Sequence, residues 1–229
     1  GKGESFRDTL LTLSYMGTDA IVMRHSAEGA PLYATKAVDP IIINAGDGAH
    51  EHPTQALLDM YSILEKKESI EGLKVVILGD IMHSRVARSN IYGLTKMGAK
   101  VHLAGPRTMV YPELEKLGVT VHHDIREAVV DADVVNVLRI QLERIHSALY
   151  PTNREYARIF GINNDVLKLA KDDVMVMHPG PMNRGLEIAP DVAYSDQSVI
   201  QEQVRNGVAV RMAVLYLTII GGDGSELAY

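Results

Sequence analysis

Hydrophobic residues along the chain fall into short runs that alternate with segments of helical spacing. The runs are rich in β-branched side chains and bounded by turn residues, which is typical of buried parallel strands. They lie at residues 20–24, 40–43, 74–78, 100–104, 119–122, 133–138 and 174–177. Helical spacing is found at residues 6–17, 31–37, 53–67, 84–97, 112–117, 125–130 and 153–170, and in a last apolar segment at 208–220. Strands that alternate with helices form parallel sheets with right-handed crossovers, so the pattern predicts an α/β fold.

A charged segment at residues 65–72 divides this alternation into two units. The unit before it has few strands and corresponds to about half a domain, whereas the unit after it is more complete. We therefore expect two doubly wound parallel-sheet domains, the first incomplete in this chain. The expected boundaries are 1–52 for the first domain, 53–67 for a helix between the domains, 68–205 for the second domain and 206–229 for a helix that returns to the first.

The first candidate site is the segment that joins the strand at 40–43 to the following helix. Proline is favoured at the first helical position, so Pro53 places the start of the helix at His52 or Pro53. His52 and Gln55 then share the first turn, at the positive end of the helix and beside the glycine turn at 46–48. These groups suit a polar, anionic small molecule. The apolar residues that recur on one side of this helix are Ala56, Leu57, Met60, Tyr61 and Leu64.

Two other interpretations apply to this segment. One is a helix cap with a structural histidine, and on these residues alone it stays open. The other is a metal site formed by His50 and His52. Alternate positions diverge once a helix begins, and the chain contains no cysteine, so we expect neither a metal nor another cofactor.

The second candidate is Arg85, which follows a buried strand and Gly79-Asp80 where open α/β sheets bind ligands. A dinucleotide site would carry Gly-x-Gly-x-x-Gly here and an acidic residue at the end of the next strand, which instead ends in Ala104-Gly105-Pro106. We interpret Arg85 as a clamp for an anion, because a guanidinium holds a carboxylate through two parallel hydrogen bonds. An ordinary surface arginine is the alternative.

Two later strand ends carry further candidates. Arg139 and Gln141 are two positions apart, so both side chains can project into one cleft while Ile140 faces the core. The turn His178–Pro181 has a backbone restricted by its prolines, and its carbonyls can accept hydrogen bonds from an amine. The alternative for Arg139 and Gln141 is a solvated strand end. The alternative for the turn at 178–181 is a plain rigid turn.

The composition excludes several classes of function. The chain has 229 residues, of which 46% are hydrophobic and 23% charged, with no cysteine and a formal net charge of -6. A packed core is expected, disulfides and thiol catalysis are excluded, and no basic face for nucleic acid is visible. The segment 208–220 is interrupted by Arg211 and is too short to cross a bilayer. We expect a cytoplasmic protein without nucleic-acid or membrane partners.

Motifs spread along the chain resemble those of the carbamoyltransferases. They are Asn-Ala-Gly-Asp-Gly-x-x-x-His-Pro-Thr-Gln ending at Gln55, Gly-Asp-x-x-x-Ser-Arg ending at Arg85, Arg-x-Gln-x-Glu-Arg from Arg139, and His-Pro-x-Pro from His178 followed by Asn183-Arg184. The Arg139 segment is similar to that of the aspartate carbamoyltransferases, whereas the ornithine enzymes carry a different segment around Ser-Met-Gly. The resemblance covers the whole chain and its motifs occur in family order.

The resemblance implies an enzyme that transfers the carbamoyl group of carbamoyl phosphate to L-aspartate, giving N-carbamoyl-L-aspartate for pyrimidine biosynthesis. It implies that residues 1–52 belong to the carbamoyl phosphate-binding domain and 68–205 to the aspartate-binding domain. The implied catalytic residues are His52, Arg24 and Lys2. Those implied to bind carbamoyl phosphate are Arg24, His52, Gln55, Gly180, Pro181 and Lys2, and those implied to bind aspartate are Arg85, Arg139 and Gln141.

The resemblance also implies partners. In the family, a lysine matched by Lys2 reaches the active site of a neighbouring subunit, so a homotrimer is expected, and a regulatory chain or a dihydroorotase stays open. The family's Ser-x-Arg-Thr-Arg phosphate loop has no match in the 229 residues. We expect that segment on a longer or cleaved polypeptide or on a separate chain, unless the protein is a noncatalytic, partner-binding relative. A carbamoyltransferase for another amino acceptor is the last alternative.

Overall fold

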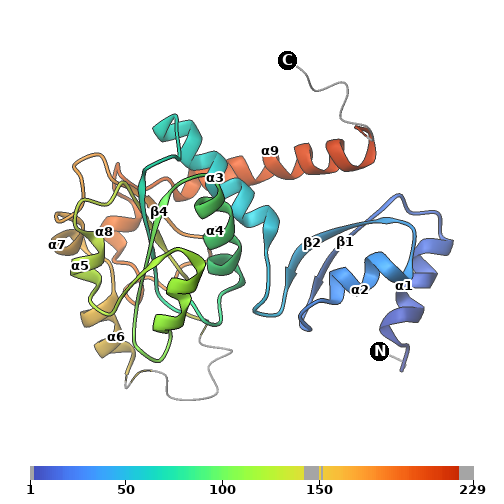
Figure 1. The fold of residues 1–229 in the computed structure, drawn as a ribbon, viewed down its shortest axis with the longest axis horizontal. Helices are drawn as coiled ribbons and strands as arrows, with labels where there is room; N and C mark the ends of the chain where they lie inside the picture. The colour runs from blue at the N-terminus through green and yellow to red at the C-terminus, as the bar shows by residue number, and fades with distance from the viewer. Residues whose placement is uncertain (1–2, 142–149, 151, 222–229) are drawn as a thin grey trace.

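The computed structural model describes residues 3–141, 150 and 152–221, which form two α/β units and two long helices that run between them (Figure 1). The strands are β1 (Ala20–His25), β2 (Ile41–Asp47), β3 (Lys74–Leu78), β4 (Lys100–Ala104), β5 (Thr120–His122), β6 (Val134–Val137) and β7 (Met175–Met177). The helices are α1 (Phe6–Tyr15), α2 (Ala30–Ala37), α3 (Pro53–Lys67), α4 (Arg85–Lys96), the 3-10 helix η1 (Pro112–Leu117), α5 (Ile125–Val129), α6 (Asn153–Phe160), α7 (Asn164–Leu167), α8 (Pro190–Ala193) and α9 (Ile200–Ile219). Every strand pair in both sheets is parallel, so the predicted α/β fold is confirmed.

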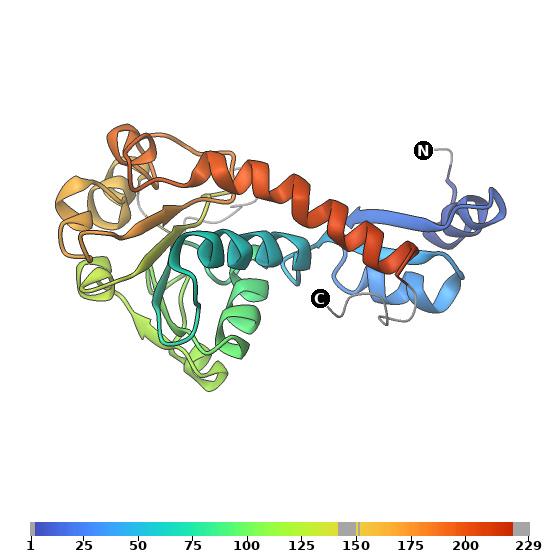
Figure 2. The same cartoon turned by 90° about the horizontal axis from the view of Figure 1, so that it is seen from above.

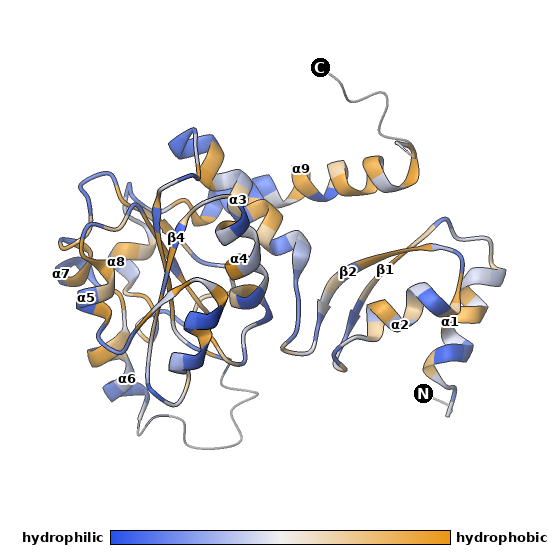
Figure 3. Ribbon diagram, in the orientation of Figure 1, coloured by the Kyte–Doolittle hydropathy of each residue, from blue (hydrophilic) through white to orange (hydrophobic). Residues whose placement is uncertain are grey.

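The larger unit is built on a five-stranded sheet with the order β5-β4-β3-β6-β7. Successive side chains point to opposite faces, so Val75 and Ile77 join one hydrophobic core while Val76 and Leu78 join the other. Both faces are covered, which is why residues 75–78 form a continuous apolar run in the sequence, and the hydrophobic stretches of the strands are orange in Figure 3. The bounds of β3 and β4 are those that the runs predict.

The smaller unit pairs β1 with β2 and packs α1 and α2 over a core of Leu10, Ile21, Met23 and Ala34. β2 continues to Asp47, well past the predicted end at residue 43. Its register against β1 shifts between Met23 and His25, where β2 contains one more residue than β1. A bulge of this kind explains why Gly46, the first residue of the predicted glycine turn, lies within the strand.

Helix α3 begins at Pro53 with His52 at its N-cap, as predicted, but only part of the predicted apolar side is buried. Ala56 is 3% exposed and Met60 packs against the core of the larger unit. Leu57, Tyr61 and Leu64 are 43%, 44% and 36% exposed. The helix instead buries residues on the side that faces α9, including Asp59 and Ser62. Hydrophobic periodicity did not identify this side because Asp59 and Ser62 are buried there beside apolar residues such as Leu58.

Helix α9 begins at Ile200, well before the predicted start at Val208. Its first turns pack along α3, and the helix then extends towards the side of the molecule that holds the small sheet (Figure 2). Its buried residues include Gln203 and Asn206, and Asn206 donates to Ser62 at 3.1 Å. Within the ranges given above, no helix has the length and apolar character that a membrane crossing requires.

Candidate active site

A cavity of about 300 Å³ lies between the two units. Its lining residues come from both sheets and from α3, α4 and α9: Arg24, His52, Gln55, Ser84, Arg85, Val86, Arg139, Gln141, Pro179, Gly180, Pro181 and Arg211. Eight of the nine predicted site residues are in this lining, and the ninth, Lys2, lies outside the described residues. The structure therefore brings together groups that are far apart along the chain.

The topology of the larger sheet explains this convergence. β3 is the strand from which the chain proceeds to β4 on one side and later to β6 on the other. In doubly wound sheets the crevice for a ligand forms at such a switch point, outside the carboxyl ends of the strands. Arg85 follows β3, Arg139 follows β6, and the turn at 178–181 follows β7, so all three reach the same edge.

The turn after β2 is organised by Asp47, which is 1% exposed. Its carboxylate accepts hydrogen bonds from the backbone N–H of Gly29 at 2.7 Å and from Asn44 Nδ2 at 2.9 Å, and it contacts His50 Nδ1 at 3.0 Å. Burial alone would raise the pKa of Asp47, but these partners together lower it. The aspartate of the sequence motif thus shapes the segment that leads to His52, and His50 is bound to it outside the cavity lining.

His52 is held by its backbone and is uncharged at neutral pH. Its backbone N–H donates to Ser89 Oγ on α4 at 2.9 Å, and the Ser89 hydroxyl donates to Glu51. Burial, together with the positive charges of Arg85, Arg211 and Arg24, lowers the pKa of His52 to about 4. Its Nδ1 is buried without a hydrogen-bond partner among the described residues. The imidazole can therefore donate a hydrogen bond to a ligand as a neutral group.

We expect His52 to titrate near pH 4 in the folded protein, instead of near 6.5. Since the folded state disfavours the protonated imidazole, the unfolded chain binds this proton at higher pH, and the free energy of unfolding decreases as pH falls from 6.5 towards 4. An NMR titration of the Cε1 proton, assigned by its absence in His52→Gln, measures the pKa. A midpoint above pH 6 would contradict the proposed surroundings of this imidazole.

Arg85 connects the two units. Its side chain is 5% exposed, and Nη1 donates to the carbonyl oxygen of Gly48 at 3.3 Å. Gly46 has a φ of +117°, and a Cβ at this position would lie 2.7 Å from Arg85 Nε. The glycine is thus required twice, once for the backbone conformation and once for the space that the guanidinium occupies.

The turn after β7 is fixed by a buried histidine and a buried glutamate. Gly180 N–H donates to His178 Nδ1 at 2.9 Å, so the proton of the neutral ring is on Nε2, which lies 3.1 Å from Glu187 Oε1. Asn183 Nδ2 donates to the carbonyl oxygen of Ile140 at 2.8 Å. This last bond ties the turn to the strand end that carries Arg139, so two parts of the cavity wall are held in one arrangement.

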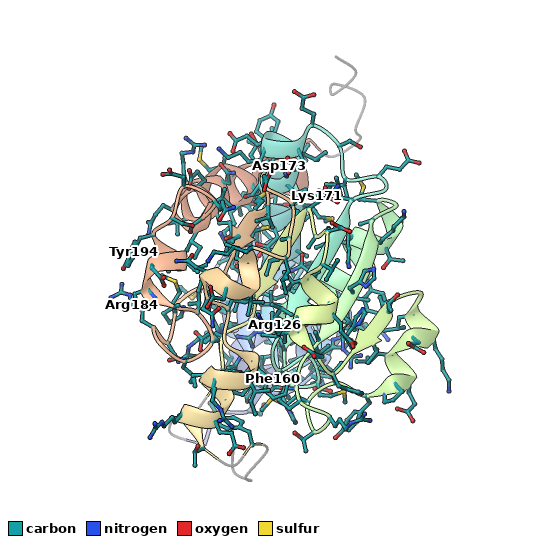
Figure 4. All side chains as sticks on the ribbon, turned by 90° about the vertical axis from the view of Figure 1, so that its left-hand side faces the viewer. Arg126, Phe160, Lys171, Asp173, Arg184 and Tyr194 are labelled. Atoms are coloured by element: carbon teal, nitrogen blue, oxygen red, sulfur yellow. The ribbon has the colours of Figure 1, made fainter. Side chains whose placement is uncertain are left out.

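The positions of two arginines do not follow from the sequence motifs. Arg211 lines the cavity from α9, although no sequence motif points to it. In the sequence, the one feature that could have indicated a role for Arg211 is that it is an isolated charge within a long apolar segment. Arg184, which matches the arginine after the His-Pro-x-Pro motif, lies 5.5 Å from the centroid of the Tyr194 ring and is not in the lining (Figure 4).

The electrostatics of the cavity favour negatively charged ligands. Among the described residues, its lining contains four arginines, a neutral histidine and no carboxylate. Gln141 Oε1 is buried without a hydrogen-bond partner in the same ranges, so it can accept from a ligand. Those ranges contain no group of three or more His, Cys, Asp or Glu side chains that could hold a metal ion.

Comparison with known proteins gives consistent matches. Residues 71–218 match the family described as aspartate/ornithine carbamoyltransferase, Asp/Orn binding domain, and residues 1–65 match the carbamoyl-P binding domain of the same enzymes. The chain is 61% identical over 227 residues to the aspartate carbamoyltransferase catalytic subunit of Desulforamulus reducens, covering 99% of this chain and 72% of that protein.

Two solved structures are similar. The ornithine carbamoyltransferase from Pyrococcus furiosus is 33% identical with a TM-score of 0.82, and the match covers 96% of this chain and 72% of that one. The aspartate transcarbamoylase from Trypanosoma cruzi in complex with N-(phosphonacetyl)-L-aspartic acid is 32% identical with a TM-score of 0.79, over 94% of this chain and 69% of that one.

Proposed function

Because the chain belongs to the aspartate/ornithine carbamoyltransferase family, we propose that its arginine-lined cavity is the active site for carbamoyl transfer. The function is that of an aspartate carbamoyltransferase: the carbamoyl group of carbamoyl phosphate passes to the α-amine of L-aspartate, giving N-carbamoyl-L-aspartate and phosphate for pyrimidine biosynthesis. The assignment of individual residues to steps of this reaction is our proposal.

Carbamoyl phosphate binds on the side of the cavity formed by residues 1–52, the start of α3 and the turn at 178–181. His52 and Arg24 donate hydrogen bonds to the carbamoyl oxygen. Gln55 and the backbone of Gly180-Pro181 accept hydrogen bonds from the carbamoyl NH2 group. These roles are supported by the common lining of one cavity and by the neutral state of the imidazole.

Aspartate binds on the side formed by the second domain, residues 68–205. Arg85, Arg139 and Gln141 hold its two carboxylates, and the buried position of Arg85 favours a rigid grip. The neutral α-amine then attacks the carbamoyl carbon, the C–O bond to phosphate breaks, and the proton that the amine loses passes to the leaving phosphate. No covalent enzyme intermediate is needed. Two oriented reactants avoid a bimolecular encounter. Donors aimed at the carbamoyl oxygen stabilise the negative charge that develops on it.

The observation that carries this proposal is the cationic lining without a carboxylate among the described residues. Both substrates are anions, so such a cavity attracts them in a protein whose net charge is -6. The same lining favours an acceptor with two carboxylates, such as aspartate, over ornithine, which has one carboxylate and a second amino group. A carbamoyltransferase for another acceptor is therefore the weaker candidate, although the overall fold does not distinguish the two.

An assay of carbamoyl aspartate formation tests the function. The 229-residue chain is assayed by itself and joined to a segment that carries the family's Ser-x-Arg-Thr-Arg loop, with ornithine replacing aspartate as the control. Product from aspartate and none from ornithine, in either form of the chain, supports the proposal. Absence of product from both forms would favour a noncatalytic relative.

Gly46→Ala should weaken aspartate binding because its Cβ would meet the Arg85 side chain. A displacement of roughly 1 Å can cost about 100-fold in rate, and we expect the KM for aspartate to rise by about 10-fold to 100-fold. Steady-state kinetics with each substrate varied in turn measure this. Gly17→Ala is the control, because Gly17 also has a positive φ but a Cβ there would meet no atom within 4 Å. Equal effects of the two substitutions on aspartate KM would contradict the steric argument.

We also propose that the active protein is a homotrimer in which Lys2 enters the site of a neighbouring subunit. This rests on the family resemblance of the Lys2 segment. Sedimentation equilibrium tests the assembly. Mixing a Lys2→Ala variant with a His52→Ala variant tests the sharing, because shared sites would recover activity in hybrid trimers and unshared sites would not.

A further inference from the structure

A buried carboxylate lies next to the active site and has no part in the mechanism described so far. Asp59 is 0% exposed and sits one helical turn after Gln55 on α3. The hydrogen bonds that it accepts come from side-chain amides. Gln55 Nε2 donates to Oδ1 at 3.0 Å, Gln203 Nε2 donates to Oδ1 at 2.8 Å, and Asn90 Nδ2 donates to Oδ2 at 2.8 Å. Helices α3, α4 and α9 therefore meet at one carboxyl group.

The chemistry of these bonds determines how the amides are oriented. Burial raises the pKa of Asp59 to about 6, and hydrogen bonds from Asn90, Gln203, Gln55 and Asn136 oppose this rise. Because amide NH2 groups donate to both carboxyl oxygens, these partners favour the carboxylate form, which can only accept. Each partner must then present its NH2 group to Asp59. For Gln55 this leaves Oε1 as the end of the amide that is available to the cavity.

The hydrogen bond from Gln203 to Asp59 also fixes the orientation of the Gln203 amide, which contacts the turn at 178–181. Gln203 Oε1 accepts a hydrogen bond from the backbone N–H of His178 at 2.9 Å. That residue begins the turn whose Gly180-Pro181 peptide lines the cavity. A second hollow of about 210 Å³ is lined by both Gln55 and this turn, together with Gln203. Asp59 is thus one bond from Gln55 and two bonds from the turn.

We propose that Asp59 is a positioning residue of the active site, which fixes the amide of Gln55 with its oxygen towards the carbamoyl NH2 and, through Gln203, fixes the turn at 178–181. The inference rests on the proposed function of the cavity. The role accounts for a carboxylate in a helix contact where its hydrogen-bond donors are amides and not a basic side chain. A neutral side chain could not accept hydrogen bonds from all of these amides at once.

Asp59→Asn tests the proposal. The new NH2 group would face the NH2 groups of its partners, so Gln55 would turn its oxygen towards the substituted side chain in a fraction of molecules. We expect kcat/KM for carbamoyl phosphate to fall by about 10-fold to 100-fold. In a Gln55→Ala background the same substitution should cost clearly less than in the unsubstituted protein, because only the connection through Gln203 to the turn at 178–181 then remains.

Ser62→Ala is the matched control. Ser62 is one turn further along α3, 2% exposed, and bonded to Asn206 in the same contact with α9. This substitution should lower the melting temperature and leave kcat/KM unchanged. If Asp59→Asn does not fold, Gln203→Met provides the second test, since it breaks the connection to His178 and should lower kcat/KM for carbamoyl phosphate.

The outcomes separate this inference from the proposed function. If Asp59→Asn and Ser62→Ala are equally active, or if the Asp59→Asn loss is the same with and without Gln55, the role of Asp59 is overturned while the function stands. If Gln55→Ala itself has full activity, the role assigned to Gln55 fails first. Loss of activity in Asp59→Asn that depends on Gln55 supports the inference.

Discussion

Replacing His52 with alanine should lower kcat by roughly 100-fold to 1000-fold and leave the affinity for carbamoyl phosphate within about threefold of the unsubstituted protein. The reason is that negative charge develops on the carbamoyl oxygen only when the amine attacks. A donor aimed at that oxygen stabilises the transition state more than the bound substrate. The imidazole is neutral at neutral pH and is held from its backbone by Ser89, so it needs no proton uptake to act.

The measurement is steady-state kinetics at saturating aspartate, combined with equilibrium binding of carbamoyl phosphate. His50→Ala is the control, because His50 belongs to the same segment but is bound to Asp47 outside the cavity lining. It should keep kcat near the unsubstituted value. Unchanged turnover in His52→Ala would remove this side chain from the mechanism.

The second large effect is expected for Arg139→Ala, which should raise the KM for aspartate at least about 30-fold, corresponding to roughly 2 kcal/mol or more. A carboxylate of bound aspartate would lose a charge-assisted partner inside the cavity. Carbamoyl phosphate lies on the other side of the cavity, so its KM should change much less.

Kinetics with each substrate varied in turn separate the two substrates. Arg88→Ala is the control for loss of a positive charge, because Arg88 is exposed on α4 one turn after Arg85 and does not line the cavity. An effect of Arg139→Ala confined to carbamoyl phosphate would mean that the two halves of the cavity are assigned to the wrong substrates.

The strand pattern and most of the site could be predicted from the sequence for a common physical reason. Strands buried on both faces must be apolar runs, and the carboxyl ends of neighbouring parallel strands meet at one edge. Polar residues that directly follow such runs, such as Arg85 and Arg139, therefore converge whatever separates them in the chain. His52 was found in the same way, from the strand end at β2 and the proline that starts α3.

The contact between α3 and α9 could not be predicted, because it is polar where periodicity expects apolar residues. Gln203 and Asn206 are 3% exposed each, yet their segment has no hydrophobic stripe that marks a helix. The early start of α9 was missed for this reason. Asp59 was missed as well, since a carboxylate within a helix is indistinguishable from a surface charge in the sequence, and its amide partners come from other elements.

The convergence of both substrates on one arginine-lined cavity can be tested by a crystal structure with N-(phosphonacetyl)-L-aspartic acid, which combines features of carbamoyl phosphate and aspartate. We expect the ligand in the cavity, with its two aspartyl carboxylates on Arg85 and Arg139 and its carbonyl oxygen within hydrogen-bond distance of His52. Density for the ligand elsewhere, with these three side chains making no contact to it, would contradict the proposed mechanism.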